Sequence, residues 1–411
     1  MKTLLIIGAG REQVPAYSLA KQKGYVVVGT DIDPFAPGFD LADFRLLCST
    51  RDVEATLAAV IAFHQQHHIS GVMTIANDCP YTVSRVAEAL GLPCAPSECV
   101  RRLTDKVEMK ICFQAATVKT PEFWVVQSIE DLTARMRLLD EGPFILKPSD
   151  GRGSRGVLFI ENDGDLTWAY THAMSTCANG RLVLERFVAG PQLSVEGIFV
   201  DGKYYAVAYA DRNYDNLEKT KPYIVEDGGV IPSKYEGTIL EDICNLIERG
   251  AKALGLTFGS VKADIVMGKN GPEIIELAGR LSGNYLATHH IPMAYGVDLV
   301  GALIDLCMGK AIDVKALIPI QKKFLGVRYF FPVAGVIESI ENVNEVASLA
   351  YVRLLDIYVS PGDTQPPIDN HGARAGTIIC EGDTYAEAKM RVENAVSVID
   401  FKVTECGGSV A

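Results

Sequence analysis

The first ninety residues of the chain alternate short apolar runs with amphipathic stretches. The apolar runs TLLIIGAG, YVVVGTD and GVMTIAND are typical of buried strands, and residues 14–23, 53–67 and 81–90 are predicted helices. Alternation of strand and helix predicts a parallel sheet, whose binding groups lie at the carboxyl ends of its strands. We therefore predict an α/β domain over residues 1–96.

The pattern changes after the segment LPCAPS. A predicted helix containing TDKVEMK is followed by a block of strands, FILKPSDGRGSRGVLFI, RLVLERFV, LSVEGIFV and YYAVAYA, and later by a helix near residues 298–309. From about Lys322, shorter strands alternate with helices near residues 343–350 and 385–398, which is typical of an α+β unit. These changes predict three further domains, over residues 97–188, 189–320 and 321–405.

Residues 261–267 and 272–278 predict a β-hairpin, because both are strand-like and the GKNG run between them is turn chemistry. One pairing register places Asp264 directly opposite Glu276, and facing like charges destabilise a sheet. A hard cation between the two carboxylates explains the pair better, and oxygen-only ligands suit Mg²⁺. Arg280 then supplies positive charge to an anion held by that metal. The alternative is a solvated acidic edge followed by a helix-capping arginine.

A glycine-rich loop follows the strand that ends in Lys147. The segment FILKPSDGRGSRGV, residues 144–157, has three glycines after that lysine and before another strand. Glycine lets the backbone approach closely, and successive N–H groups in such a loop can cradle phosphate oxygens. The motif is not a Walker loop, because the lysine precedes the glycines and no helix follows. The charges of Lys147, Arg152 and Arg155 favour phosphate contact over a plain hairpin tip.

Composition and charge narrow the classes of protein. The chain has 411 residues, of which 48% are hydrophobic and 22% charged, and a net charge of −12, which fits an enzyme of several domains. The negative charge opposes binding to nucleic acid over a large surface. No apolar run is long enough to span a bilayer and no signal peptide begins the chain, so we expect a cytoplasmic protein without membrane contact. The ten cysteines contain no CxxC pair, which disfavours a zinc site.

The first strand ends at Gly8, Ala9 and Gly10 and the second at Asp31, which is similar to a dinucleotide-binding fingerprint. The third glycine of that fingerprint is missing, because Gln13 stands where helix and strand pack closely. NAD binding is therefore not favoured. A nicotinamide oxidoreductase is an alternative that rests on these residues alone.

The order and spacing of TDKVEMK, ILKPSDGRGSRGV, LERFV and the hairpin resemble those of the ATP-grasp enzymes. Within that superfamily the chain resembles carboxylate–amine ligases such as the L-amino acid ligases, with kinship to biotin carboxylase and the large subunit of carbamoyl phosphate synthetase. The resemblance covers nearly the whole chain. It implies an ATP-grasp fold, α/β and α+β in class, with an N-terminal Rossmann-like pre-ATP-grasp domain, two ATP-grasp subdomains and a C-terminal α+β lobe.

The resemblance also implies a role for each matching residue. Asp264 and Glu276 look like ligands of Mg²⁺, for which Mn²⁺ can substitute, and Arg280 looks like the arginine that steadies the transferring phosphoryl group. Lys106 and Lys147 look like the two nucleotide lysines. Glu185 is expected to face the adenine amino group or the ribose. The ATP contacts expected in the glycine-rich loop, which is the expected lid, and between the two subdomains are Ser149, Gly153, Ser154, Gly156, Glu185, Phe187, Val188 and Gln192.

Two residues depart from the family pattern. Gln192 stands where a glutamate often binds the ribose, so we expect a weaker but retained contact there. Ala278 stands two residues after the metal-binding glutamate, where an asparagine is common, so a second metal ion lacks one usual ligand.

The substrate side of the sequence is less distinctive. Arg212 and Glu226 are candidates to hold the charged ends of an amino acid, and a surface loop with solvated charges is an equal alternative. His289 and His290 are expected to border the cavity, and a capped helix entry accounts for them equally well.

We predict an ATP-dependent ligase that activates a small carboxylic acid, such as an amino acid, as an acyl phosphate and joins it to an amine, releasing ADP and phosphate. Such chemistry needs positioning and cations more than covalent catalysis, which fits a chain without a nucleophilic triad. The expected partners are small-molecule carboxylate and amine substrates, and relatives suggest a homodimer. Two alternatives share the fold: a carboxylase that makes carboxyphosphate, and a non-catalytic nucleotide-binding protein.

Overall fold

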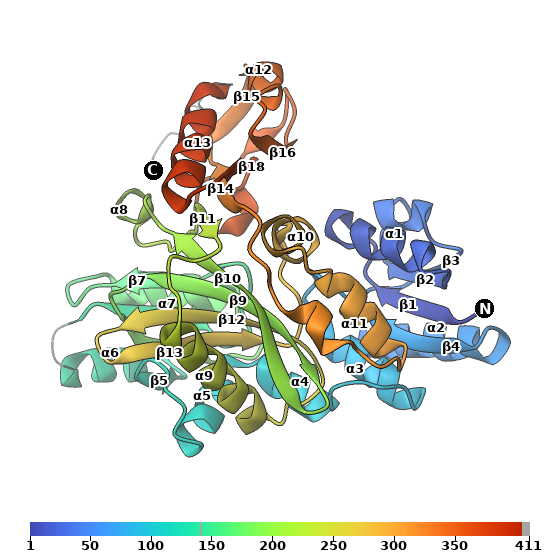
Figure 1. The fold of residues 1–411 in the computed structure, drawn as a ribbon. Helices are drawn as coiled ribbons and strands as arrows, with labels where there is room; N and C mark the ends of the chain where they lie inside the picture. Colours follow the sequence, from blue (N-terminus) through green and yellow to red (C-terminus); the bar gives the residue numbers. More distant parts are fainter. Residues whose placement is uncertain (140–141, 405–411) are drawn as a thin grey trace.

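The computed structural model describes residues 1–139 and 142–404, which form four β-sheets with helices packed between and around them (Figure 1). The last part predicted from the sequence ends at residue 405, one position outside the described residues. Within the described residues, no helix has the length and apolar character needed to cross a membrane.

The N-terminal sheet is parallel, as predicted, with the strand order β3-β2-β1-β4. Side chains of β1 alternate between two cores: Leu5 and Ile7 pack with α2 and α3, and Leu4 and Ile6 with α1 and α11. Both faces of the sheet are covered, which is why its strands are apolar runs. The elements are β1 (Thr3–Ile7), η1 (Arg11–Gln13), α1 (Val14–Gln22), β2 (Val26–Asp31), η2 (Pro37–Asp40), β3 (Phe44–Leu47), α2 (Val53–Gln66), β4 (Ile69–Met73) and α3 (Pro80–Ala89).

A small antiparallel sheet of order β5-β8-β6-β7 follows, with two helices packed on it. Two further helices lead into it, and the second begins where the Asp105 side chain accepts a hydrogen bond from the backbone N–H of Val107 at 2.9 Å. The elements are α4 (Ser97–Leu103), α5 (Lys106–Ala115), β5 (Phe123–Val126), α6 (Ile129–Leu138), β6 (Phe144–Pro148), β7 (Leu158–Ile160), α7 (Leu166–Ser175) and β8 (Leu182–Arg186).

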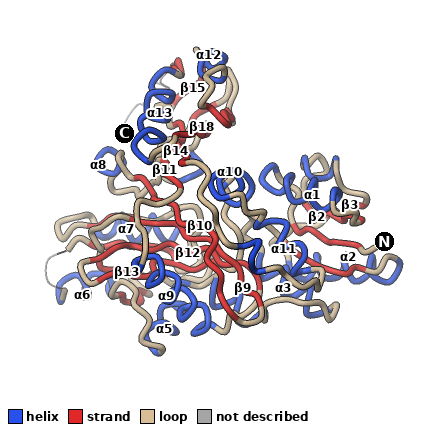
Figure 2. The backbone as a smooth tube through the Cα atoms, in the orientation of Figure 1, coloured by secondary structure: helices blue, strands red, loops and turns tan. Residues whose placement is uncertain are grey.

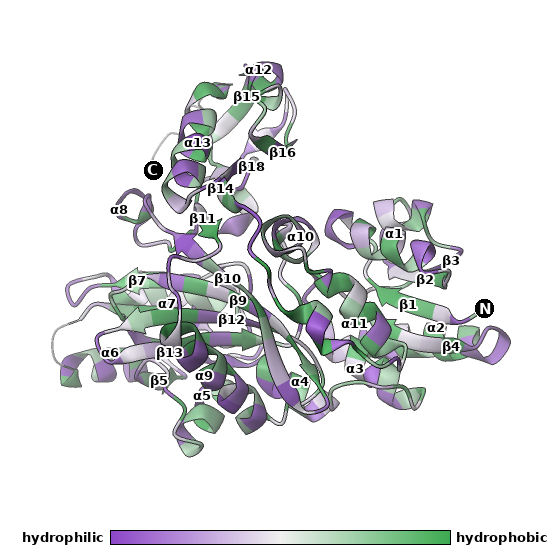
Figure 3. Ribbon diagram, in the orientation of Figure 1, coloured by the Kyte–Doolittle hydropathy of each residue, from purple (hydrophilic) through white to green (hydrophobic). Residues whose placement is uncertain are grey.

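The largest sheet has eight antiparallel strands in the order β13-β12-β9-β10-β11-β14-β18-β16. Helix α9 packs on it, and the hydropathy colours change between green and purple along this helix, as expected of an amphipathic element (Figure 3). Gly255, in the left-handed conformation, ends α9. The elements are β9 (Gln192–Val200), β10 (Lys203–Asn213), α8 (Leu217–Thr220), β11 (Gly228–Ile231), α9 (Thr238–Leu254), β12 (Gly259–Gly268), β13 (Gly271–Ala278), β14 (Phe324–Phe330), β16 (Val352–Ile357) and β18 (Gly376–Gly382).

This sheet crosses the boundary predicted between residues 320 and 321. Strand β11 pairs with β14, so that Val230 lies opposite Gly326, and β14 then pairs with β18. The predicted C-terminal lobe is therefore joined to the preceding part by backbone hydrogen bonds. The tube drawing shows this run of strands from β10 up to β18 (Figure 2). The remaining elements of the lobe are β15 (Gly335–Glu341), α12 (Val343–Ala347), β17 (Thr364–Gln365), η5 (His371–Ala373), α13 (Tyr385–Val398) and β19 (Asp400–Thr404).

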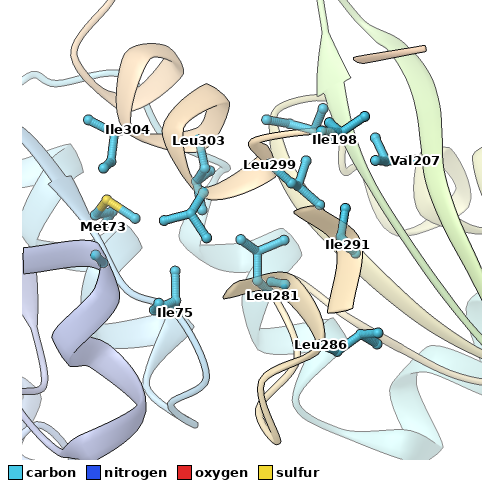
Figure 4. Close-up of a cluster of buried hydrophobic side chains, with 14 of the residues drawn as sticks. Met73, Ile75, Ile198, Val207, Leu281, Leu286, Ile291, Leu299, Leu303 and Ile304 are labelled. Carbon is cyan, nitrogen blue, oxygen red and sulfur yellow. The ribbon is translucent and has the colours of Figure 1, made fainter. Parts of the chain in front are cut away.

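A buried apolar cluster joins the N-terminal sheet to the large sheet. It contains the predicted helix near residues 298–309, which is α11 (Leu299–Cys307), together with η3 (Leu286–His290) and α10 (Ile291–Tyr295); η4 (Val314–Leu317) follows. In Figure 4, α11 lies between Met73 and Ile75 of the N-terminal part and the strands that carry Ile198 and Val207. This packing fixes the carboxyl ends of the N-terminal strands against the large sheet.

We predict that Leu299→Ala lowers the free energy of unfolding by roughly 2–5 kcal/mol, because the Leu299 side chain is fully buried in this cluster. Urea-induced unfolding followed by circular dichroism measures the change. The matched control is Leu138→Ala, whose side chain is 80% exposed, and it should change stability by less than about 0.5 kcal/mol. Equal effects of the two substitutions would contradict the role of the cluster.

Candidate active site

A cavity of about 320 Å³ lies between the small sheet and the large sheet, and residues from the N-terminal part and the C-terminal lobe complete its wall. Its volume is within the range of ligand pockets. Most site residues predicted from the sequence line it: Lys106, Lys147, Gly153, Ser154, Glu185, Phe187, Val188, Gln192, Arg212, Glu226, Asp264, Glu276, Arg280 and His290. Three predicted residues, Ser149, Gly156 and His289, do not line it.

Two lysines and a glutamate form a buried charge cluster on one side of the cavity. The Glu185 Oε1 atom lies 2.5 Å from Lys147 Nζ and 3.1 Å from Lys110 Nζ. Burial raises the pKa of Glu185, but attraction by Lys110 and Lys147 outweighs it and leaves that pKa below its ordinary value. Burial lowers the pKa of Lys110 to about 8. We expected Glu185 to face adenine or ribose. In the structure, one of its carboxylate oxygens forms ion pairs with both lysines.

Lys110 was missed by the sequence analysis. It follows Lys106 by one helical turn in α5, so the spacing in TDKVEMK places both lysines on one face of that helix. Lys106 reaches a different part of the cavity, because its Nζ donates to the carbonyl oxygen of Gly151 at 2.7 Å and lies 3.4 Å from Glu276 Oε1. Helix α5 therefore connects the glycine-rich loop to the hairpin.

The glycine-rich loop runs from β6 to β7, and a strand follows it as predicted. Gly153, Ser154 and Gly156 all have positive φ. A Cβ atom at Gly156 would lie 2.3 Å from Thr176 Oγ1, so close packing requires glycine there. Ser149 is fully buried and its hydroxyl bonds the side chain of Asn179, so both Ser149 and Gly156 shape the loop from outside the cavity.

The predicted hairpin register is confirmed at the carboxylates, because Asp264 pairs with Glu276 across β12 and β13. A β-bulge immediately after Asp264 shifts the rest of the hairpin by one residue. Asp264 Oδ1 accepts from Ser194 Oγ and lies near Arg212, both at 3.1 Å, and Oδ2 pairs with Lys262. Burial raises the pKa of Asp264, but these two cations outweigh it and lower that pKa to about 2.

Arg212 and Glu226, the candidates for the charged ends of a substrate, pair with each other. Arg212 NH2 lies 3.0 Å from Glu226 Oε2, which in turn lies 3.5 Å from Arg374 NH2 of the C-terminal lobe. A chain of alternating charges therefore runs from Arg374 through Glu226 and Arg212 to Asp264 and Lys262. The sequence analysis missed Lys262 and Arg374. Lys262 could have been found from its two-residue spacing to Asp264, which places both side chains on one face of the strand. No comparable signal points to Arg374.

Arg280 is held by the N-terminal part of the chain. Its Nε and NH2 atoms donate to Asp78 Oδ1 at 3.1 and 2.9 Å. The following loop is fixed by two carboxylates: the buried Glu196 accepts from the Ser282 N–H at 2.5 Å, and the half-buried Glu12 accepts from the Asn284 N–H. Asp78 follows the carboxyl end of β4, the edge of the parallel sheet at which we predicted binding groups.

The two predicted histidines have different surroundings. His290 is buried in the cavity wall, and burial lowers its pKa to about 3, so its imidazole is neutral at physiological pH. His289 lies outside the wall, where its ring meets Tyr285 edge-on. A third histidine, His371, enters the cavity wall from the C-terminal lobe.

Asp264 and Glu276 fit a magnesium ion that arrives with phosphate. Mg²⁺ is usually bound by one or two carboxylates together with substrate phosphates and water. Within the described parts of the chain, no group of three or more His, Cys, Asp or Glu side chains is arranged to hold a metal.

Three protein families match the chain. Residues 103–284 match the ATP-grasp domain, residues 26–94 the ATP-grasp N-terminal domain, and residues 328–404 the L-amino acid ligase C-terminal domain 2. The chain therefore belongs to the ATP-grasp superfamily, and its fold is the ATP-grasp fold with an N-terminal domain. The last match agrees with the carboxylate–amine ligase class that the sequence resembles.

Three individual proteins are similar to this chain. The uncharacterized protein y4rH of Sinorhizobium fredii is 23% identical over 363 residues, which cover 86% of this chain and 73% of that protein. The alanine–anticapsin ligase of Bacillus subtilis is 26% identical over 257 residues, which cover 56% of this chain and about half, 52%, of that ligase. The crystal structure of L-amino acid ligase from Bacillus licheniformis has a TM-score of 0.83 at 18% identity, covering 98% of this chain and 99% of that chain.

The pKa of Lys110 gives a test of the buried charge cluster. It is about 8 in the folded protein against an ordinary value of 10.5, so between these values the unfolded chain binds more protons and stability rises with pH. We predict that the free energy of unfolding of the wild type rises by roughly 3 kcal/mol relative to that of Lys110→Met as pH rises from about 8 to 10.5.

Urea unfolding at several pH values measures this difference between wild type and variant. The matched control is Lys269→Met, because Lys269 is exposed in the hairpin turn. The free energy of unfolding of this variant should change with pH in the same way as that of the wild type. The same pH dependence for Lys110→Met and wild type would contradict the lowered pKa.

Proposed function

We propose that this protein is an ATP-dependent ligase that activates a small carboxylic acid, such as an amino acid, as an acyl phosphate and joins it to an amine, with release of ADP and phosphate. One observation carries the proposal: a single cavity is lined by Lys106, Lys147 and the glycine-rich loop and also by the facing Asp264 and Glu276. ATP and Mg²⁺ are generally used by the superfamily. The L-amino acid ligase match of the last domain supports the substrate class.

Each group in the cavity has a proposed task. Lys106, Lys147 and the backbone of the glycine-rich loop bind the phosphates, and Phe187, Val188 and Gln192 bind the adenosine. Asp264 and Glu276 hold Mg²⁺, which supplies positive charge to the phosphate oxygens. Arg280 stabilises the charge on the transferring phosphoryl group, an effect worth about 10²–10³ in rate for a well-placed donor.

The pairing of Arg280 with Asp78 fits this task. A guanidinium fixed by two hydrogen bonds to one carboxylate oxygen keeps its orientation, while its NH1 atom donates to the carbonyl oxygen of Leu281 at 3.2 Å. Positioned charge costs little reorganisation during the reaction. Asp78 is therefore proposed as the residue that orients Arg280.

The substrate side follows from charge. Arg212 and Glu226 are proposed to orient the charged groups of the substrate, and they reach it as members of one ion-pair chain. Neutral His290 borders the same space, and His289 lies outside the cavity lining. We also propose the four domains with the bounds given above, a homodimer and a cytoplasmic location. These three proposals come from the sequence and accompany the proposed function.

We predict that Glu276→Ala lowers turnover at least about 100-fold while the fold is retained, because a partly exposed carboxylate that contacts Lys106 is lost from the metal site. Rates of ADP formation with Mg²⁺ give the effect, and circular dichroism checks the fold. Glu273→Ala on the same strand is the matched control, since Glu273 lies outside the cavity wall. Substantial residual activity of Glu276→Ala would remove this residue from the metal site.

The reaction type is tested by the nucleotide product. We predict ADP and phosphate in the presence of Mg²⁺, a carboxylic acid and an amine, and little turnover when either substrate is omitted or the metal is chelated. A panel of amino acids, other carboxylic acids, amines and bicarbonate identifies the substrates. AMP and pyrophosphate would rule out the acyl phosphate, ADP formed with bicarbonate alone would indicate the carboxylase, and ATP binding without turnover would indicate a non-catalytic protein.

A further inference from the structure

The tip of the glycine-rich loop touches the C-terminal lobe. The backbone N–H of His371 donates to the carbonyl oxygen of Gly153 at 3.1 Å, and the His371 Nε2 atom lies 3.1 Å from Ser154 Oγ within hydrogen-bond distance. These residues are more than 200 positions apart in the chain. The loop therefore closes against a domain that lies on the other side of the cavity.

The base of the loop is fixed independently of this contact. Asp150 accepts from the N–H groups of Ala178 and Asn179, and Phe159 at the far end donates to the carbonyl oxygen of Pro222. The tip's own hydrogen bonds are local turns, from Arg155 to Arg152 and from Val157 to Ser154. The Lys106 side chain also donates to the carbonyl oxygen of Gly151, next to the base. Among the described residues, the hydrogen bonds that link Gly153 and Ser154 to a distant part of the chain come from His371.

The backbone conformation of the tip also indicates that an outside contact holds it. Ser154 has a φ of 61°, in the left-handed region that residues other than glycine seldom adopt. A conformation of this kind persists where its surroundings hold it. The hydrogen bond between Ser154 and His371 is such a constraint.

The segment that carries His371 is itself rigidly placed. The Asn370 side chain accepts from the Gly372 N–H at 2.7 Å, and Gln365 donates to the carbonyl oxygen of Ala373 at 2.7 Å. Arg374 stacks on the ring of Tyr329, with 3.6 Å between its guanidinium carbon and the ring centre, and pairs with Glu226. Through that pair the segment belongs to the ion-pair chain that includes Asp264.

We propose that residues 370–374 of the C-terminal lobe form a latch that holds the glycine-rich loop closed over the cavity, with His371 as the positioning residue. This inference rests on the proposed function, in which the loop covers the phosphates of ATP. A closed loop excludes water from an acyl phosphate, which water would hydrolyse. Because the latch is connected to Asp264, closure also fixes the loop relative to the metal-binding side.

Proteolysis of the protein without ligands tests the latch directly, because Arg152 and Arg155 are trypsin sites within the tip. We expect His371→Ala, which loses the bond to Ser154, to be cleaved there about fivefold faster than wild type. His371→Pro also loses the backbone donor and should be cleaved faster still. His371 is the first residue of a short 3₁₀ helix and follows an extended residue, so proline fits its backbone.

Matched variants separate the latch from general destabilisation. His371→Gln keeps a donor near the position of Nε2 and should restore cleavage close to the wild-type rate. His68→Ala removes an exposed histidine of the N-terminal part and should have no effect. Ser154→Ala should be cleaved as fast as His371→Ala, and the double variant no faster than either. Mass spectrometry of the fragments gives the rates, and the temperature of unfolding checks the fold of each variant.

The ratio of ADP released to ligated product tests the consequence for the reaction. We expect this ratio to rise several-fold in His371→Ala, because water reaches the acyl phosphate when the loop opens, and to return in His371→Gln. Equal cleavage of wild type, His371→Ala and His371→Pro would overturn the latch. Faster cleavage with an unchanged ratio would overturn its role in excluding water. A wild type without ligase activity would overturn the proposed function, while cleavage would still test the latch.

Discussion

The facing carboxylates Asp264 and Glu276 impose the constraint on which the site depends. Two like charges in register on adjacent strands repel each other, and Asp264 is also buried, so cations must come from other elements. Lys106 comes from α5 and Arg212 from β10, and Lys262 adds a third cation from β12 itself. Helix α5 and strand β10 therefore have to meet at this hairpin for its charges to be balanced.

The same balance explains how the cavity accepts a highly charged ligand. Asp264, Glu276 and Glu226 each already contact a cation, so the proposed magnesium nucleotide would exchange one set of ion pairs for another. Little net charge has to be created in the low-dielectric interior, where an unpaired charge is costly. The buried cluster of Lys110, Lys147 and Glu185 has an excess of one positive charge when both lysines are protonated, which favours phosphate over a neutral ligand.

Sequence reasoning succeeded where the signal is local. The strands and helices of the N-terminal sheet, the hairpin register at Asp264 and the strand after the glycine-rich loop each follow from patterns among neighbouring residues, and the alternation of those elements predicts that the N-terminal sheet is parallel. It missed contacts between distant segments: Asp78 with Arg280, Lys110 with Glu185, and His371 with the loop. No local pattern encodes these pairs, because each depends on how separate sheets pack. Strand β11 was also missed, since its four residues, two of them glycines, carry almost no strand signal.

That short strand has a consequence for the architecture. By pairing with β10 on one side and β14 on the other, Gly228–Ile231 joins the ATP-binding half of the large sheet to the C-terminal lobe. A chain that ended before β14 would expose β11 as an unpaired edge, the kind of edge that recruits other chains into aggregates. The lobe therefore also acts as the cap of the sheet. A different lobe in its place would have to offer an equivalent strand to cap this edge.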